Sequence, residues 1–458
     1  MALAPRALAA LKELVGERVR TGSDEIGTYA RDASHLVGAP DAVVRPTDAE
    51  EVVALVEWAR AHQVPLVARG AGTSLDGESV PLSGVVVDLS SWSGILEIDP
   101  VDRVARVQPG VVNHDLQIAA RAHGLFFPPN PGSWRTSTIG GNVATNASGP
   151  RSFRYGPTRH WVREAEVVLG TGERIRVGSR SPKRSIGPDL LQMLVGSEGT
   201  LGLFTEISVA LAPLPARRSA LGVGLPTGAK LGPIVAELAR ALSDGLTALE
   251  YLDRRCADTL ARTPGSRLPS GDALLLLEVE SASEPEEAEQ LERLTQRLTR
   301  LGVVRDPVVF PDADRLWSLR GESGTALDRE MGERVREDVC VPVSRLDELL
   351  GLIERLGHES GVATCVYGHL GEASVHPNFA IDPTTDAAAR LRERFLRGTI
   401  KLGGVVSGEH GIGAVKRELL GEQVGAIGLR VLRALKSECD PEGILNPGKL
   451  SDRAAGTP

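Results

Sequence analysis

Cysteine, aromatic residues and long apolar runs are all scarce in this chain of 458 residues. Its four cysteines, Cys256, Cys340, Cys365 and Cys439, form no CxxC pair. Neither an iron–sulfur cluster nor a disulfide framework is therefore indicated, and we expect buried reduced thiols. No apolar run approaches the roughly 20 residues that a membrane-spanning helix needs, and the first 20 residues lack the apolar core of an export signal. We expect a cytoplasmic protein, which could associate with a membrane through a partner.

The charge balance excludes a general polyanion binder. The chain has 52 Lys and Arg residues and 60 Asp and Glu residues, which gives a formal net charge of -8. We therefore do not expect nucleic acid as a partner. With 41% hydrophobic and 24% charged residues the composition is that of a globular protein. At roughly 150 residues per domain, the length predicts two or three domains.

Alternating strand and helix patterns begin near residue 42. A short strand at 41–46 is followed by Thr47-Asp48-Ala49-Glu50, which matches a capping box and predicts that a helix starts there. Further strands are expected at 64–68, 85–89 and 103–107. After Pro213 and Pro215 the composition shifts to segments rich in leucine, glutamate and arginine, which indicates a second domain. In this domain we expect strands at 274–280, 339–343 and 362–366 and a helix at 346–356. A further helix is expected at 286–300, with Ala288, Leu291, Leu294 and Leu298 on one face.

Three glycine-rich stretches, residues 69–77, 128–149 and 196–202, are the first indication of a ligand. In Arg69–Gly77, glycine leaves consecutive backbone N–H groups free to converge on an anion such as a pyrophosphate, although an ordinary glycine-rich turn is an equal alternative. The stretch matches neither the Rossmann GxGxxG nor the P-loop motif, which indicates a different nucleotide-binding fold.

The order of these motifs resembles that of the FAD-linked D-2-hydroxyacid dehydrogenases of the vanillyl-alcohol oxidase superfamily. The resemblance rests on residues 43–89, PPNPGSWRTSTIGGNVATNASG (128–149), RYGPTRHWV (154–162), LVGSEGTLGLFTEISVAL (194–211), GHLGEASVHPN (368–378), GGVVSGEHGIG (403–413) and DPEGILNPGKL (440–450). It implies an α+β fold with an N-terminal helical segment (1–35), an FAD-binding domain (36–215), a substrate domain (216–425) and a C-terminal helix and segment that returns to the flavin (426–458).

The resemblance also implies which residues hold the FAD. No histidine lies in the first glycine-rich loop, so we expect the FAD to be non-covalent. For Tyr155, a flavin contact and a packed core aromatic remain equal alternatives. The implied FAD-binding residues are Arg69, Gly70, Ala71, Gly72, Thr73 and Ser74 at the pyrophosphate; Pro131, Gly132, Thr138, Gly140, Gly141, Asn142, Thr145 and Asn146 along the flavin; Glu198, Gly199 and Ile207 at the adenosine end; and Asn446.

Three of the nine histidines lie in two short glycine-flanked segments, which favours a site over three separate structural roles. A hairpin through Gly371 would bring His369 and His376 together, and Gly408 and Gly411 would let the chain turn at Glu409 and His410. The resemblance implies that His369, His376 and Glu409 ligate a divalent metal and that His410 is the general base. Two imidazoles and a carboxylate suit zinc, manganese or iron.

The chain departs from the family pattern at two places. Residues 371–374 read GEAS where the family usually reads GDGN, and we expect a different loop geometry there. The family's lysine is replaced by Arg336, from which we expect a shift in substrate choice. Arg320 matches the family's carboxylate-clamping arginine and Asn378 a substrate-contacting asparagine. A solvated surface pair is the alternative for both arginines.

The expected activity is oxidation of a small D-2-hydroxy acid to the 2-oxo acid, with hydride transfer to the flavin. Two alternatives stay open: a non-redox transferase like the ether-lipid synthase of the same superfamily, and a non-catalytic flavoprotein subunit. The electron acceptor could be a partner subunit, a quinone-linked protein, a cytochrome or an electron-transfer flavoprotein.

Overall fold

The computed structural model describes residues 3–264, 266–302 and 305–450, which divide into two compact units. Unit 1 draws on Met1–Ser148, Pro157–Leu214 and Glu409–Pro458, and unit 2 on Gly149–Gly156 and Pro215–Gly408. The short segment 149–156 thus packs with unit 2, and residues 409–425 pack with unit 1. Within the described ranges, no helix combines the length and the apolar character needed to cross a membrane.

Unit 1 contains a small sheet and a larger antiparallel sheet. The small sheet has the order β1-β2-β4-β3, with β2 and β3 parallel to β4. Its core includes buried side chains of α1 and α3. The elements are α1 (Pro5–Val15), β1 (Val19–Arg20), α2 (Ser23–Ile26), β2 (Ala42–Val44), α3 (Ala49–His62), β3 (Leu66–Arg69) and β4 (Val85–Asp88).

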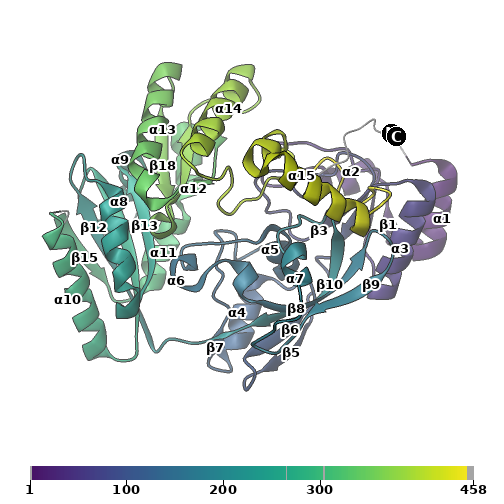
Figure 1. Cartoon of the computed structure of the whole chain (residues 1–458), viewed down its shortest axis with the longest axis horizontal. Coiled ribbons are helices and arrows are strands. Elements are labelled where there is room, and N and C mark those ends of the chain that lie inside the picture. The colour runs from purple at the N-terminus through teal and green to yellow at the C-terminus, as the bar shows by residue number, and fades with distance from the viewer. Residues whose placement is uncertain (1–2, 265, 303–304, 451–458) are drawn as a thin grey trace. The chain divides into compact units, whose positions relative to one another are not determined.

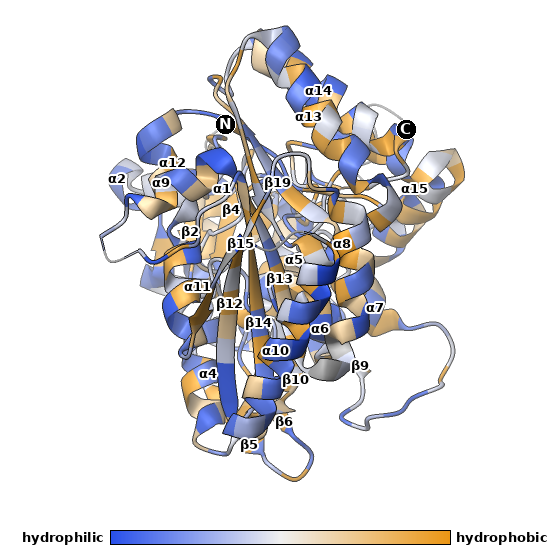
Figure 2. Ribbon diagram, turned by 90° about the vertical axis from the view of Figure 1, so that its left-hand side faces the viewer, coloured by the Kyte–Doolittle hydropathy of each residue, from blue (hydrophilic) through white to orange (hydrophobic). Residues whose placement is uncertain are grey.

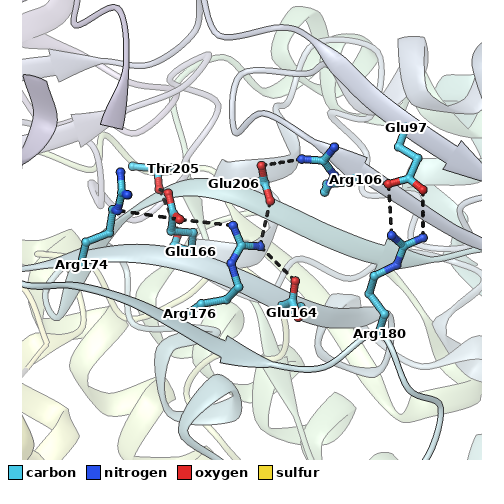
Figure 3. Close-up of polar contacts among 9 residues, drawn as sticks. All are labelled: Glu97, Arg106, Glu164, Glu166, Arg174, Arg176, Arg180, Thr205 and Glu206. Atoms are coloured by element: carbon cyan, nitrogen blue, oxygen red, sulfur yellow. Dashed lines mark hydrogen bonds and ion pairs between the residues drawn. The ribbon is translucent and has the colours of Figure 1, made fainter. Parts of the chain in front are cut away.

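The larger sheet of unit 1 has the order β5-β6-β10-β8-β9. One face covers a core shared with α4, α5 and α7, and the other carries a ladder of arginines and glutamates across the strands (Figure 3). The elements are β5 (Ile95–Asp99), β6 (Val104–Val107), α4 (Asn113–Arg121), β7 (Leu125–Phe126), α5 (Ile139–Thr145), β8 (Val162–Leu169), β9 (Arg174–Gly178), α7 (Leu190–Leu194), β10 (Gly202–Ala210), β11 (Ala212–Pro213) and α15 (Leu420–Cys439).

Unit 2 is built on an antiparallel sheet with the order β15-β12-β14-β13-β18-β19-β16, and β17 pairs with β19 (Figure 1). The elements are α6 (Ser152–Tyr155), β12 (Arg217–Leu225), α8 (Leu231–Leu238), β13 (Leu246–Asp253), α9 (Arg254–Ala261), β14 (Ala273–Ser281), α10 (Glu284–Arg300), β15 (Arg305–Phe310), α11 (Ala313–Gly321), α12 (Ser323–Met331), β16 (Val335–Arg336), β17 (Val339–Cys340), α13 (Leu346–Ser360), β18 (Thr364–Gly368), β19 (Ser374–Phe379) and α14 (Asp386–Lys401).

Helices cover both faces of the unit 2 sheet. Leu274 and Leu276 pack with buried side chains of α9, α11 and α12, whereas α8, α10 and α13 lie against the opposite face. This double coverage explains why every residue of β14 is buried. Figure 2 shows strands of this sheet in mostly hydrophobic colours.

The expected strands and helices are present, with three local corrections. Asp48, not Thr47, is the N-cap of α3: its carboxylate accepts from the Glu51 N–H, and the Glu51 carboxylate accepts from the Thr47 N–H. The strand expected at 339–343 is only two residues long. In α10 Ala288 is exposed, because the helix buries Glu287, Gln290, Leu294 and Leu298 instead.

All four cysteines are free thiols. Cys256 and Cys365 are buried as expected, whereas Cys340 and Cys439 are only partly buried.

Candidate functional site

The first glycine-rich loop of unit 1 leaves the end of β3 and packs closely against the start of α5. A Cβ atom on Gly70 would lie 2.3 Å from the Thr138 hydroxyl, so only glycine allows this approach. Thr138 is the N-cap of α5 and accepts a hydrogen bond from the Gly141 N–H. The two stretches that the sequence assigned to the pyrophosphate and the flavin are therefore neighbours in unit 1.

The C-terminal segment of unit 1 pairs with the strand that leads into this loop. Leu66 N–H donates to the carbonyl of Ile444, and Asn446 N–H donates to the carbonyl of Leu66. The Asn446 side-chain amide donates to the carbonyls of Glu78 and Glu198, at 2.8 and 2.7 Å. Asn446 thus connects the strand that leads into the first glycine-rich loop with the backbone at Glu78 and Glu198.

Glu198 holds the residues that follow His410. Its carboxylate accepts the Ile412 N–H at 2.7 Å and the Gly413 N–H at 2.9 Å. Burial raises the pKa of Glu198 to about 7, although these two N–H groups oppose the shift. Burial also raises the pKa of Glu78, and the neighbouring Glu198 adds to that shift. Glu78 is a residue of this loop cluster that the sequence analysis did not identify.

Buried polar atoms of unit 1 fit a bound dinucleotide. Arg69 Nη1, Ser137 Oγ, Asn142 Nδ2 and Ser197 Oγ are buried and have no hydrogen-bond partner among the described residues. Unpaired buried donors are costly, so these four indicate polar groups that the protein itself does not supply. A Cβ atom on Gly132, which is exposed, would meet no described heavy atom within 4 Å. The residues present therefore fit FAD.

The remaining implied FAD residues take different positions in unit 1. Ile207 lies fully buried in β10, in the core behind the larger sheet. Thr145 donates to the carbonyl of Gly141 inside α5, and the side-chain oxygen of Asn146, which caps that helix, accepts the Arg159 N–H. Tyr155 lies outside unit 1: it belongs to unit 2, where its side chain is partly buried and its hydroxyl donates to Glu280.

Unit 2 brings His369 and His376 together on the expected hairpin. His369 follows β18, a short 3-10 turn (Leu370–Glu372) reverses the chain, and His376 lies in β19, which pairs antiparallel with β18. A Cβ atom on Gly371 would lie 2.5 Å from the Phe153 ring, so segment 149–156 packs directly on this turn. Both histidines are 6% exposed, and their candidate ligand nitrogens lie within 4.8 Å of each other.

A buried acid faces the Nδ1 atom of each histidine. Glu250 Oε1 lies 2.6 Å from His369 Nδ1, and Asp338 Oδ1 lies 3.7 Å from His376 Nδ1. Asp338 also accepts the Gly408 N–H at 2.9 Å and the Ser407 hydroxyl at 3.2 Å. Sequence reasoning missed both acids, because each lies more than 30 residues from the histidine that it faces.

Glu409 and His410 begin the last segment of unit 1. One peptide bond joins Glu409 to Gly408, whose position Asp338 fixes. A Cβ atom on Gly408 would lie 2.6 Å from the Ser374 hydroxyl, and Gly411 has a φ of 99°, which favours glycine. His410 Nε2 lies 3.7 Å from Glu409 Oε1, and the His410 side chain is 21% exposed.

The two candidate substrate arginines lie in different surroundings. The side chain of Arg320 is 11% exposed, pairs with Glu250 at 2.7 Å and stacks over the Tyr367 ring. The side chain of Arg336 is 45% exposed and forms an ion pair with Asp328, whose side chain is 47% exposed. This contact has the form of the solvated surface pair that was the alternative to a substrate contact. Arg334, which sequence reasoning missed, is fully buried and donates to the side-chain oxygen of Asn378 at 2.8 Å.

Two family models together match most of the chain. One described as an FAD binding domain matches residues 40–178, and one described as the C-terminal domain of FAD linked oxidases matches residues 214–450. The glycine-rich loops and the two-unit architecture are thus those of an FAD-binding oxidoreductase. The chain belongs to the family of FAD-linked oxidases.

Similar curated proteins extend along nearly the whole chain. D-lactate dehydrogenase of Archaeoglobus fulgidus is 37% identical over 89% of this chain and 90% of its own. Glycolate oxidase subunit GlcD of Bacillus subtilis is 34% identical over 92% and 91%, respectively. D-2-hydroxyglutarate dehydrogenase of Stutzerimonas stutzeri is 33% identical over 97% and 99%.

Solved structures of low sequence identity share the fold. The structure of p-cresol methylhydroxylase superimposes with a TM-score of 0.82 at 19% identity, covering 98% of this chain and 96% of that chain. Alkyldihydroxyacetonephosphate synthase gives 0.76 at 19% identity, covering 97% and 86%. The predicted α+β fold of the vanillyl-alcohol oxidase type is confirmed.

Proposed function

We propose that the protein oxidises a small D-2-hydroxy acid, of the lactate, glycolate or 2-hydroxyglutarate class, to the 2-oxo acid. The observation that carries the proposal is the buried His369–His376 hairpin, present in a chain whose full-length relatives are named for these substrates. FAD, when bound, would supply the two-electron acceptor for the hydride from the substrate Cα. The remaining steps are assigned to side chains of this chain.

The proposed metal ligands are His369, His376 and Glu409. Two imidazoles and one carboxylate fit a zinc, manganese or iron ion with positions left for a hydroxy acid. Such an ion supplies Lewis-acid stabilisation of the alkoxide oxygen. The buried histidine pair supports this proposal, because a preformed ligand set avoids the entropy of assembling it at the moment of binding.

We propose that an imidazole nitrogen of His410 takes the proton from the substrate hydroxyl. Arg320 holds the substrate carboxylate, because its buried position favours a strong charge-assisted contact. Arg336 and Asn378 are further proposed substrate contacts. The exposed pair of Arg336 with Asp328 contributes little, so a substrate carboxylate could replace Asp328 without a large penalty.

Anaerobic mixing of the FAD-loaded protein with hydroxy acids tests the proposal. D-lactate, glycolate and D-2-hydroxyglutarate are compared with the L-enantiomers, with and without a chelator. We expect at least one D-acid or glycolate to bleach the flavin absorbance, and the chelator to slow bleaching. Absence of bleaching by every acid would overturn the oxidation and favour a transferase, while bleaching unaffected by metal removal would overturn the metal's role.

His410→Ala tests the general base. We expect FAD to remain bound while the rate of its reduction falls by about 100-fold or more, the usual contribution of a positioned base. His123→Ala, which changes an exposed histidine of unit 1, is the control and should reduce at the original rate. Unchanged reduction of His410→Ala would remove this residue from the mechanism.

We further propose that the electrons leave through a partner protein. This proposal is supported by the similarity to the Bacillus subtilis protein, which is a subunit of glycolate oxidase. Turnover of the isolated chain with an artificial dye, but not with oxygen, is expected. Rapid turnover with oxygen alone would contradict the need for a partner.

A further inference from the structure

Glu250 occupies an unusual position for a charged side chain. It lies in β13, and its side chain is fully buried on the sheet face that α11 covers. The hydrophobic neighbours Leu249 and Leu252 make this strand resemble an ordinary core strand. A buried carboxylate persists only where partners compensate for its lost hydration. The partners of Glu250 therefore indicate why it is there.

Glu250 has two partners on opposite sides of its carboxylate. Its Oε1 lies 2.6 Å from His369 Nδ1. Its Oε2 accepts a hydrogen bond from Arg320 Nε at 2.9 Å and forms an ion pair with Arg320 Nη2 at 2.7 Å. One acid thus contacts both a proposed metal ligand and the proposed carboxylate clamp.

The contact with His369 selects one tautomer of its ring. A carboxylate paired with a guanidinium can only accept, so the proton of a neutral His369 ring lies on Nδ1. Its Nε2 atom then carries the lone pair that a metal requires. The same carboxylate uses the Nε and Nη2 groups of Arg320, while the Tyr367 ring stacks beneath the guanidinium at 4.7 Å. The contacts of Glu250 with the Arg320 guanidinium are made to Nε and Nη2 and leave the Nη1 group for another partner.

We propose that Glu250 is a positioning residue that couples the metal site to the substrate clamp. This inference rests on the proposed function, since it assigns Glu250 to the same metal and hydroxy acid. Glu250 holds the His369 ring with Nε2 presented for the metal, and it holds Arg320 with Nη1 presented for the substrate carboxylate. Loss of Glu250 therefore weakens two binding events that a purely structural acid would leave unchanged.

The other metal histidine is held less directly. Asp338 Oδ1 lies 3.7 Å from His376 Nδ1, beyond hydrogen-bond distance. The other carboxylate oxygen of Asp338 accepts hydrogen bonds from the Ser407 hydroxyl and the Gly408 N–H. The orientation of His369 therefore depends on its acid more than that of His376 does. Glu250→Gln is expected to weaken metal binding more than Asp338→Asn weakens it through His376.

Metal titration of the chelator-treated, FAD-loaded full chain tests the inference. Mn²⁺ and Zn²⁺ binding are measured by calorimetry for the original protein, Glu250→Gln and Thr247→Val. Thr247 is a matched control, because it lies buried in the same strand and its hydroxyl donates to the carbonyl and the carboxylate of Glu278. We expect Glu250→Gln to bind metal 10- to 100-fold more weakly, the usual effect of removing an acid behind a metal-bound histidine, and Thr247→Val to bind normally.

A second readout separates this role from a loss of packing. Nitrogen-15 spectra of the histidines in the metal-free protein should show His369 protonated at Nδ1, and this preference should be lost in Glu250→Gln. The KM for the hydroxy acid should rise as Arg320 loses its support. If Glu250→Gln does not fold, Glu250→Asp, which keeps the charge but shortens the side chain, tests the positioning role of Glu250 instead. This variant should bind metal more weakly than Thr247→Val.

The outcomes distinguish two failures. If the original protein binds neither Mn²⁺ nor Zn²⁺, the proposed metal function fails. If it binds them and both Glu250 variants bind equally well, with the His369 tautomer unchanged, the coupling role of Glu250 is wrong while the proposed function survives.

Discussion

Lys416 forms a buried ion pair with Asp76 inside unit 1, with 2.9 Å between Nζ and the carboxylate. The Lys416 side chain is 1% exposed and that of Asp76 7%. The pair joins the C-terminal segment to the end of the first glycine-rich loop. Lys416→Met leaves Asp76 buried opposite an uncharged side chain, and we expect unit 1 to lose about 3–5 kcal/mol of stability. Hydrogen exchange of peptides from unit 1, measured by mass spectrometry, checks this.

Arg20→Met provides the contrast for Lys416. Arg20 and Glu25 form an ion pair with both side chains more than half exposed, at 53% and 54%. Removing such a pair costs about 0–1 kcal/mol. Equal exchange rates in the Lys416 and Arg20 variants would show that the buried pair contributes no more than a surface one.

Glu278 makes the stability of unit 2 depend on pH. Burial raises its pKa, but attraction to Arg151 and Arg218 outweighs burial and lowers it to about 2. Because the folded pKa lies below the usual value, Glu278 stabilises the fold above pH about 4.5, and this stability is lost as the pH falls through about 2. Glu278→Gln should therefore be less stable than the original protein at pH 7, with a difference that shrinks on acidification. Urea unfolding at several pH values measures it.

Glu280, two residues further along β14, should behave in the opposite way. Burial raises its pKa, so folding favours the protonated form and the stability it contributes at low pH is lost as the pH rises through the folded pKa. Glu280→Gln mimics that neutral form and should gain stability relative to the original protein as the pH increases. The same sign for both variants would contradict the assignment of these two glutamates.

The charged ladder of unit 1 should respond to salt (Figure 3). Arg176 reaches Glu164 at 3.0 Å and Glu206 at 2.9 Å across the outer face of the larger sheet, with its side chain 44% exposed. Arg176→Met is expected to reduce stability by about 1 kcal/mol at low salt. At 1 M salt the screening length falls to about 3 Å, so most of this difference should disappear. Urea unfolding at both salt concentrations checks the result, and a salt-independent loss would point to packing of the arginine stem instead.

Local patterns were sufficient to predict most helices and strands and the positions of the glycine-rich loops. The β3 strand, its glycine-rich exit and the His369–His376 hairpin follow from apolar runs and glycines close together in the sequence. The N-cap of α3 was displaced by one residue because Thr47, Asp48, Glu50 and Glu51 offer two overlapping capping patterns, and only the backbone geometry selects Asp48.

Buried polar partners could not be predicted in this way. Glu250 precedes its partners Arg320 and His369 by 70 and 119 residues, and Arg334 precedes Asn378 by 44. Each pair depends on which strands become neighbours in the unit 2 sheet. An acid within an apolar strand is the one local signal that was available for Glu250 and Glu278, since such a residue needs a partner once the strand is buried.

Substitution of two glycines of unit 1 distinguishes a loss of stability of the apoprotein from a loss of FAD affinity. Gly70→Ala places a Cβ atom 2.3 Å from the Thr138 hydroxyl, so it should disturb the loop and α5 even without FAD. Gly132→Ala meets no described heavy atom within 4 Å, so the apoprotein should keep its stability. If the flavin lies beside Gly132, this variant should still bind FAD at least several-fold more weakly. Fluorescence titration with FAD and thermal unfolding of the apoproteins measure both effects, and unchanged FAD affinity of Gly132→Ala would place the flavin elsewhere.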